Sequence, residues 1–239
     1  MAMTPFEVRR WLPTVSLEPL ELILAGYCAR GDGITVVQVG ACDGSNNDPI
    51  HRYVAQGLVN AVLIEPNPYA FSRLEKAYAG LPNVTLIQCA IGELDGEAEL
   101  YRIKKTDKSD SEVDLTLQIA SFSRKHLVHH GKKSREIEQI KVPCRTLSSL
   151  IAELGLSRIH LLQIDAEGFD AAVVRMALKL PVLPDCINFE HIHLATRDRR
   201  PLFDLLKTNG YLLGYDEWNI LAMQQAVMER TTQVGPGKP

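Results

Sequence analysis

The stretch VVQVGACDGSNNDP, from Val36 to Pro49, decides the fold. Its first four residues favour a buried strand, and the small residues from Gly40 to Gly44 favour a tight turn. Asp48 and Pro49 are the residue types that favour a helix N-cap and a first helical position. In α/β proteins, a nucleotide-like ligand binds where such a strand meets the following helix. The stretch therefore predicts a ligand site at the carboxyl end of a buried strand.

Outward from this stretch, apolar strands alternate with helical segments. Four further strands are expected within 61–68, 83–92, 159–170 and 187–194. Alternation at this spacing predicts βαβ units and a parallel sheet. The residues 211–215 and 218–223 predict a closing hairpin. The fold class is α/β, Rossmann-like, with helices on both faces of the sheet.

The domain organisation follows from where strands and helices alternate and where this alternation is interrupted. We expect an N-terminal helical extension over 1–33 with Ser16 as its cap, one ligand-binding domain over 34–225, and a tail over 226–239. Within the domain, 97–142 interrupts the alternation with an extra strand, a polar stretch and a second exposed strand. This segment is predicted to be an insert on the substrate side.

Composition excludes several functional classes. The 239 residues, 46% of them hydrophobic, can bury one sizeable core. A formal net charge of −3 gives no basic surface for nucleic acid, and no apolar run approaches the roughly 20 residues that span a bilayer. The N-terminus lacks the features of a secretion signal, and the five cysteines contain no C-x-x-C pair. We expect a cytoplasmic protein that binds neither nucleic acid nor membrane.

Two acidic residues near the turn indicate the ligand. Glu65 follows Gly40 at about the spacing at which Rossmann-like folds place a carboxylate against ribose hydroxyls, although a capping or salt-bridge role is the alternative. The turn lacks the G-x-G-x-x-G spacing that binds a pyrophosphate, and Asp43 would repel one. A carboxylate there suits the cationic amino-acid end of S-adenosylmethionine. Together, Asp43 and Glu65 favour this cofactor over NAD.

Candidate catalytic residues follow the later strands. Asp165 ends the fourth strand, where it is a general base, orients a basic partner or ligates a metal, and Glu167 follows just after it. Alternatively, one of these two carboxylates caps the next helix. His191 ends the fifth strand and is a base or a substrate contact, with His193 two positions later. The histidines within 126–130 show no ligand spacing that predicts a metal site. A divalent metal bound by Asp165 and a neighbouring carboxylate is compatible with this site but not required.

Taken together, these residues resemble the FkbM family of S-adenosylmethionine-dependent methyltransferases from about Thr35 to Gly214. The matching pieces are VGACDGSNNDP, IEPNP, CAIG, ASFSRKHL, VPCRTLSSL, LLQIDAEGFD, FEHIHL and a late NGY. The resemblance implies a class I methyltransferase fold, with a seven-stranded, mostly parallel sheet whose last strand is antiparallel. It also implies O-methylation of a hydroxyl on a small-molecule acceptor, a sugar or a natural product, and leaves self-association open. One departure is Cys42-Asp43, which stands where many relatives have Asn and a variable residue.

The resemblance also assigns residues to the cofactor. Gly40, Asp43 and Gly44 would wrap its methionine end, and Glu65 would hold the ribose. Asp165, Glu167 and His191 would face the transferable methyl group. The remaining expected cofactor contacts are Ala41, Pro66, Asn67, Cys89, Ala90, Ser121 and Phe122, of which Cys89 and Ala90 would lie beside the adenine.

Three alternatives stay open at this point. A non-catalytic cofactor-binding or partner protein would bind the cofactor without turnover. An NAD-dependent Rossmann oxidoreductase would need phosphate-binding glycines, which the turn lacks. Methylation of a nitrogen on a peptide or nucleic acid would call for an N-P-P-Y-type motif, which the sequence lacks.

Overall fold

Strand β1 (Ile34–Val39) lies at the centre of the fold. The structure is a computed structural model, and it describes residues 19–29, 31, 33–45, 48–104 and 119–232. It pairs in parallel with β2 (Val59–Ile64) on one side and with β8 (Leu161–Ile164) on the other. Every residue of β1 except Thr35 is buried, as expected for a parallel strand that helices cover on both faces. The three strands end together, because Val39 pairs with both Ile64 and Ile164.

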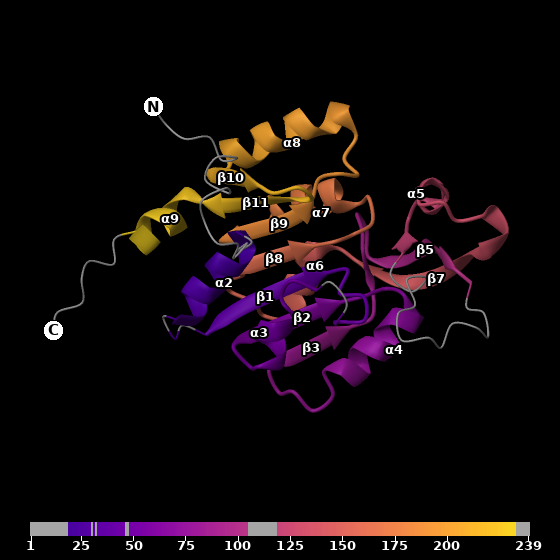
Figure 1. Ribbon diagram of the computed structural model, residues 1–239, viewed down its shortest axis with the longest axis horizontal. Helices are drawn as coiled ribbons and strands as arrows, with labels where there is room; N and C mark the ends of the chain where they lie inside the picture. Colours follow the sequence, from indigo (N-terminus) through magenta and orange to yellow (C-terminus); the bar gives the residue numbers. More distant parts are fainter. Residues whose placement is uncertain (1–18, 30, 32, 46–47, 105–118, 233–239) are drawn as a thin grey trace, which may run out of the picture.

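In the described residues, this sheet has seven strands in the order β10-β11-β9-β8-β1-β2-β3 (Figure 1). The outer strands are β3 (Val84–Ile87), β9 (Cys186–Glu190), β10 (Tyr211–Tyr215) and β11 (Asn219–Gln224). Strand β11 runs antiparallel to both of its neighbours, β9 and β10, and the other pairings are parallel. This confirms the class I arrangement, with an antiparallel last strand and a closing hairpin.

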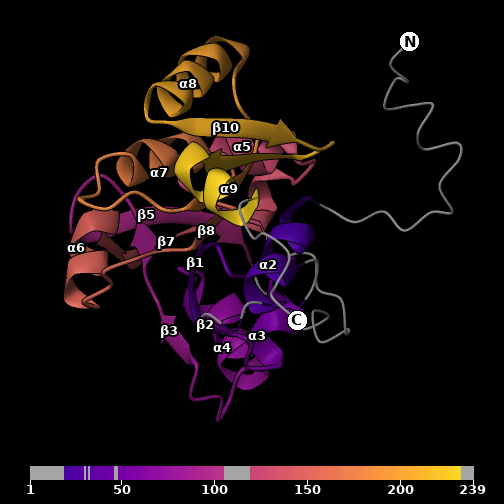
Figure 2. The same cartoon turned by 90° about the vertical axis from the view of Figure 1, so that its left-hand side faces the viewer.

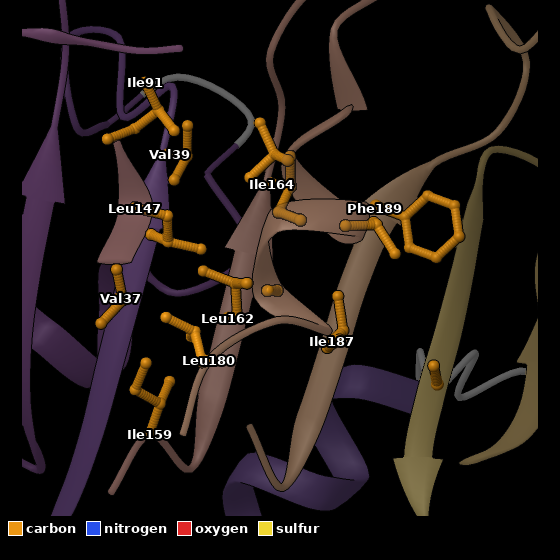
Figure 3. Close-up of a cluster of buried hydrophobic side chains, with 14 of the residues drawn as sticks. Val37, Val39, Ile91, Leu147, Ile159, Leu162, Ile164, Leu180, Ile187 and Phe189 are labelled. Atoms are coloured by element: carbon orange, nitrogen blue, oxygen red, sulfur yellow. The ribbon is translucent and has the colours of Figure 1, made fainter. Parts of the chain in front are cut away.

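Helices cover both faces of the sheet, as the view along its edge shows (Figure 2). Helices α6 (Leu147–Glu153), α7 (Asp170–Ala177) and α8 (Thr196–Thr208) pack on one face, and α2 (Pro19–Ala29), α3 (His51–Ala55) and α4 (Pro68–Ala77) on the other. Side chains alternate between the faces along a strand, so Val37 and Val39 join the first core and Ile34 and Val36 the second. Figure 3 shows the first core, where Val37, Leu162 and Ile187 come from neighbouring strands.

A smaller sheet lies beside the carboxyl ends of β1, β2 and β8 (Figure 1). Its strand order is β4-β7-β5-β6, and it has its own small cores around Leu100 and Leu127. The strands are β4 (Ala90–Ile91), β5 (Gly96–Ile103), β6 (Ala120–Ser121) and β7 (Ile137–Arg145), with helix α5 (Arg124–His129) and a 3-10 turn (Ser134–Glu136) between the last two. The segment in which the alternation of strands and helices is interrupted thus contributes to a separate sheet.

Several element boundaries differ from the sequence-based expectations. The stretch 83–92 is not one strand, because the chain turns at Cys89 and continues as β4 in the second sheet. Helix α8 begins at Thr196, before Pro201, and helix α9 (Gln225–Thr232) occupies part of the expected tail. Ser16 and the polar stretch after Lys104 lie outside the described residues. In the described part of the chain, no helix has the length and apolar composition that crossing a bilayer takes.

Candidate active site

A cavity of about 180 Å3 lies between the carboxyl ends of β1, β2 and β8 and the second sheet. We name it the first cavity. Its wall contains most of the residues that the sequence assigns to cofactor and catalysis, namely Gly40, Glu65, Pro66, Cys89, Ala90, Ser121, Phe122, Asp165 and Glu167. The sequence did not single out the rest of the wall: Val39, Cys42, Ile64, Ile91, Leu100, Ala120 and Ala166. Residues from distant parts of the chain therefore converge on one space.

Five of the expected site residues do not line this cavity: Ala41, Asp43, Gly44, Asn67 and His191. The side chain of Asp43 accepts hydrogen bonds from the backbone N–H of Ser45 (3.0 Å) and from its hydroxyl (3.2 Å). Asn67 caps helix α4, because its side-chain oxygen accepts from the Tyr69 N–H, and it also accepts from Arg102. In this structure, both side chains hold the backbone around the cavity.

The turn after β1 needs its glycines for close packing. Gly40 has a φ of +84°, and a Cβ atom there would lie 1.8 Å from the carbonyl oxygen of Asp165. Gly44 has a φ of +73°, and a Cβ atom there would lie 2.4 Å from the ring of Tyr78. The first glycine thus lets β1 and β8 meet, and the second lets the turn approach the end of helix α4.

Glu65 is buried just beyond the end of β2. Its carboxylate accepts the N–H of Cys42 (2.9 Å) and the N–H of Asn67 (2.7 Å). Burial is the main cause that raises the pKa of Glu65 to about 7, and the two backbone hydrogen bonds oppose it. A carboxylate has about four acceptor sites, so two remain for other donors. Glu65 can therefore tie the β1 turn to the α4 turn and still accept hydrogen bonds from a diol in the cavity.

A group of carboxylates gathers at the ends of β8 and β9. Asp165 keeps accessible surface on the walls of both cavities. Desolvation by the surrounding protein, followed by the charges of Glu167 and Asp170, raises its pKa well above the ordinary value. Burial likewise raises the pKa of Glu190 to about 7. Asp165 and Glu190 are therefore stronger bases than solvated carboxyl groups.

The turn after β8 is held in a strained conformation. Glu167 has a φ of +47°, which non-glycine residues rarely adopt. The Ser121 hydroxyl donates to the Glu167 carbonyl (2.8 Å), and the side chain of Asp170 accepts the N–H groups of Ala166 and Gly168 (3.3 Å each). Asp170, and not Asp165 or Glu167, therefore holds the backbone at the start of α7. Ser121 fastens the second sheet to this turn.

A second cavity, of about 580 Å3, lies beyond Asp165 toward β9 and β11. Asp165 is on the wall of both cavities. The other wall residues of this second cavity are Leu20, Pro49, Gln163, Ile164, Asn188, Glu190, Asp216, Trp218 and Asn219. Gln163 and Asn188 sit in register on adjacent strands, and Asn188 donates to Gln163 (2.9 Å). The sequence signal for this site was an amide inside each of two apolar strands.

His191 lies apart from both cavity walls. Its backbone N–H donates to the Trp218 carbonyl (2.9 Å), and its Nε2 atom is 3.4 Å from the Asp216 carbonyl oxygen. Of the two candidate bases, Asp165 and His191, it is Asp165 that lies on the wall of both cavities.

A group of three histidines, His126, His130 and His193, lies next to Glu167. One ring nitrogen from each lies within 4.8 Å of the others. The Nε2 atom of His126 is 2.8 Å from Glu167 Oε2, and burial lowers the pKa of both His130 and His193. The sequence missed this group because His193 is far along the chain from the other two.

Comparisons with known proteins agree with this fold. The family model described as the methyltransferase FkbM domain matches residues 38–212. No curated protein matches the chain.

Solved structures that match this chain include the methyltransferase FkbM from Methylobacillus flagellatus KT, which is 15% identical with a TM-score of 0.48. That match covers 80% of this chain, which spans 44% of the length of the other. The O-methyltransferase from Bacillus cereus in complex with SAH is 13% identical, with a TM-score of 0.43, over 92% of this chain and 87% of that one. The fibrillarin pre-rRNA processing protein from Methanococcus jannaschii is 10% identical, with a TM-score of 0.44, over 81% and 67%.

Proposed function

This chain belongs to the FkbM methyltransferase family, and we propose that it methylates a hydroxyl oxygen of a small-molecule acceptor, such as a sugar or a natural product, with Asp165 as general base. The observation that carries the proposal is the position of Asp165 on the wall of both cavities. A base in that place touches whatever lies in the first cavity and whatever lies in the second. The first cavity would hold the cofactor and the second the acceptor.

The first cavity fits S-adenosylmethionine, which supplies an electrophilic methyl group on a positively charged sulfur. Glu65 has acceptor sites left for the ribose hydroxyls, and the apolar side chains of Ile91, Leu100 and Phe122 suit an adenine ring. Glu65, Asp165 and Glu167 make the wall acidic. An acidic wall favours a cationic ligand and disfavours the pyrophosphate of NAD. In this proposal the positive charge of the bound cofactor would favour the ionised forms of Glu65 and Asp165, whose pKa values burial raises.

The second cavity suits a hydroxylated acceptor. The amides of Gln163, Asn188 and Asn219 offer both donors and acceptors, and Glu190 and Asp216 offer further acceptors. Trp218 adds a flat apolar surface of the kind that packs against a sugar ring or a polyketide. A few convergent polar groups with one aromatic wall are typical of small-molecule sites. These side chains would orient one hydroxyl of the acceptor toward Asp165.

The proposed reaction requires the protein to position the reactants and to accept one proton. The acceptor oxygen forms a bond to the methyl carbon as the bond from that carbon to sulfur breaks, and the hydroxyl proton goes to Asp165. The raised pKa of Asp165 makes it a better acceptor of that proton. Holding the reacting atoms in line and in contact can lower the barrier by about 7–11 kcal/mol in favourable cases. The two cavities would supply this positioning.

The test is transfer of an isotope-labelled methyl group from S-adenosylmethionine to a panel of sugars and polyketide-type alcohols. On an acceptor that works, Asp165→Asn should lower kcat by about 10²–10⁴-fold, because the general base is lost. Its affinity for S-adenosylhomocysteine, measured by calorimetry, should change little. Near-normal turnover of Asp165→Asn would remove it as the base.

Glu190→Gln is the matched control, because Glu190 lines only the second cavity. It should raise KM for the acceptor more than it lowers kcat. Tight cofactor binding with no transfer to any oxygen acceptor would instead favour a non-catalytic cofactor-binding protein.

A further inference from the structure

We propose that His126, His130 and His193 bind one divalent transition-metal ion of the zinc type at the edge of the first cavity. His126 and His130 stand one helical turn apart at α5, and His193 follows strand β9 on the main sheet. A ring nitrogen from each lies within 4.8 Å of the others. Zinc binds imidazole nitrogen at roughly 2.0–2.1 Å, so the three nitrogens lie close to the spacing at which one ion contacts all of them.

Two of the three histidines already have the carboxylate partners that metal-binding histidines need. His126 Nε2 lies 2.8 Å from Glu167 Oε2, and His193 Nε2 lies 3.4 Å from Glu190 Oε2. In metal sites, the ring nitrogen that does not bind the ion usually donates to such a carboxylate, which fixes the tautomer and the ring orientation. The two carboxylates come from different elements, and each of them contacts a different histidine.

The third histidine has a buried polar atom that nothing satisfies. His130 Nε2 is inaccessible and has no hydrogen-bond partner among the described residues. Leaving such an atom unsatisfied destabilises the folded protein. The rings of His126 and His193 lie 4.5 and 4.8 Å from the His130 ring, and this packing explains its position but not its unsatisfied nitrogen. A metal ion would satisfy it.

The donor set selects the class of metal. Imidazole nitrogens suit Zn²⁺, Co²⁺, Ni²⁺ and Fe²⁺, whereas Mg²⁺ and Ca²⁺ require oxygen ligands. Three protein ligands leave a coordination position for water or an oxygen of a bound molecule. Glu167 contacts His126 and also lines the first cavity, so an ion here would brace the cavity wall. It would also connect the second sheet to the main sheet.

The proposal is tested by metal titration of the untagged full chain after dialysis against EDTA. Co²⁺ binding is followed by its visible absorption, and Zn²⁺ is then added in competition. Wild type should bind one ion per chain. His130→Ala and His193→Gln should each weaken binding by about 100-fold or more, and Glu167→Gln by about 10–100-fold.

His129→Ala is the matched control, because His129 is an exposed neighbour on the same helix outside the histidine group. It should leave metal affinity within about twofold of wild type. Wild type with no saturable binding would overturn the proposal, as would equal binding by wild type and the double variant of His130 and His193, or an equal loss in His129→Ala.

Circular dichroism and the Tm of each metal-free variant show that it is folded. His193→Gln lies in a loop, so it keeps the test valid if His130→Ala fails to fold. Added Zn²⁺ should raise the Tm of wild type and His129→Ala only. None of these measurements uses turnover, so the result is independent of the proposed methylation.

Discussion

Two turns of the same kind flank the first cavity, one after β1 and one after β8. The strands that lead into them are parallel neighbours, and the turns touch where Gly40 packs on the Asp165 carbonyl. Each turn contains a non-glycine residue at positive φ, Cys42 (+48°) in one and Glu167 (+47°) in the other. Both of these residues line the cavity. Strained backbone at both sites is typical of a functional centre.

The two turns differ in what they present to the cavity. The β1 turn presents backbone, since the Cys42 N–H reaches Glu65 and the acidic side chain of Asp43 is engaged with Ser45. The β8 turn presents carboxylates, of which Asp165 has a raised pKa. In the proposed function, the same strand–turn–helix pattern shapes the cavity after one strand and supplies acid–base chemistry after the next. The predictions below test each side of that division.

The largest effect is expected from Gly40→Ala. The new Cβ atom would lie 1.8 Å from the Asp165 carbonyl oxygen, so the two turns would have to separate. We expect a loss of unfolding free energy of about 3 kcal/mol or more and loss of cofactor binding, measured by urea unfolding and calorimetry. Gly57→Ala is the control, because Gly57 has a similar φ (+69°) and open space around it. It should cost only about 1–2 kcal/mol. Equal losses would show that contact between the turns is unimportant.

A smaller effect, visible as a pH dependence, is expected at Glu65. Burial raises its pKa from 4.5 to about 7, so the folded protein keeps this proton at pH values where the unfolded chain has lost it. The stabilising contribution is therefore complete below pH 4.5 and is lost as the pH rises through about 7. The difference between the unfolding free energies of wild type and Glu65→Gln should fall between pH 4.5 and about 7 and stay constant at higher pH. A difference that does not vary with pH would contradict the buried, protonated carboxyl group.

The smallest effect is expected from Cys42→Asn. Asparagine tolerates positive φ better than cysteine, so the exchange should raise the unfolding free energy by a few tenths to about 1 kcal/mol. Glu167→Asn relieves similar strain but removes the contact with His126, so it should give no net gain. Urea unfolding of both variants compares the turns directly. A gain at Glu167 equal to that at Cys42 would mean that the β8 turn has no added role for its side chain.

Much of the fold could be predicted, because apolar strands and helix signals are local. The stretch from Val36 to Pro49 predicted the strand and the turn beside the first cavity, and Glu65 and Asp165, which line that cavity, were predicted from strand ends. The break at Cys89 could not be seen, since a run of apolar residues does not show that the chain changes sheets.

The site was harder to predict wherever it depends on side-chain direction or on distant contacts. Asp43 was expected at the ligand, yet its side chain forms a local turn with Ser45, a common alternative for Asp after a strand. His126 and His130 are spaced by one helical turn, which was an available signal, but only the fold brings His193 to them. The second cavity depends on strand register, which aligns Gln163 with Asn188.

The proposed function requires that the first cavity holds S-adenosylmethionine with Glu65 on the ribose. Calorimetric titration with S-adenosylhomocysteine tests it most directly, in wild type, Glu65→Ala and Asp43→Asn. Asp43→Asn keeps an oxygen that can accept from Ser45 and removes the negative charge. We predict that wild type binds one molecule, that Glu65→Ala loses affinity by about 10–100-fold, and that Asp43→Asn stays within about threefold. Equal affinity of wild type and a folded Glu65→Ala would contradict the claim.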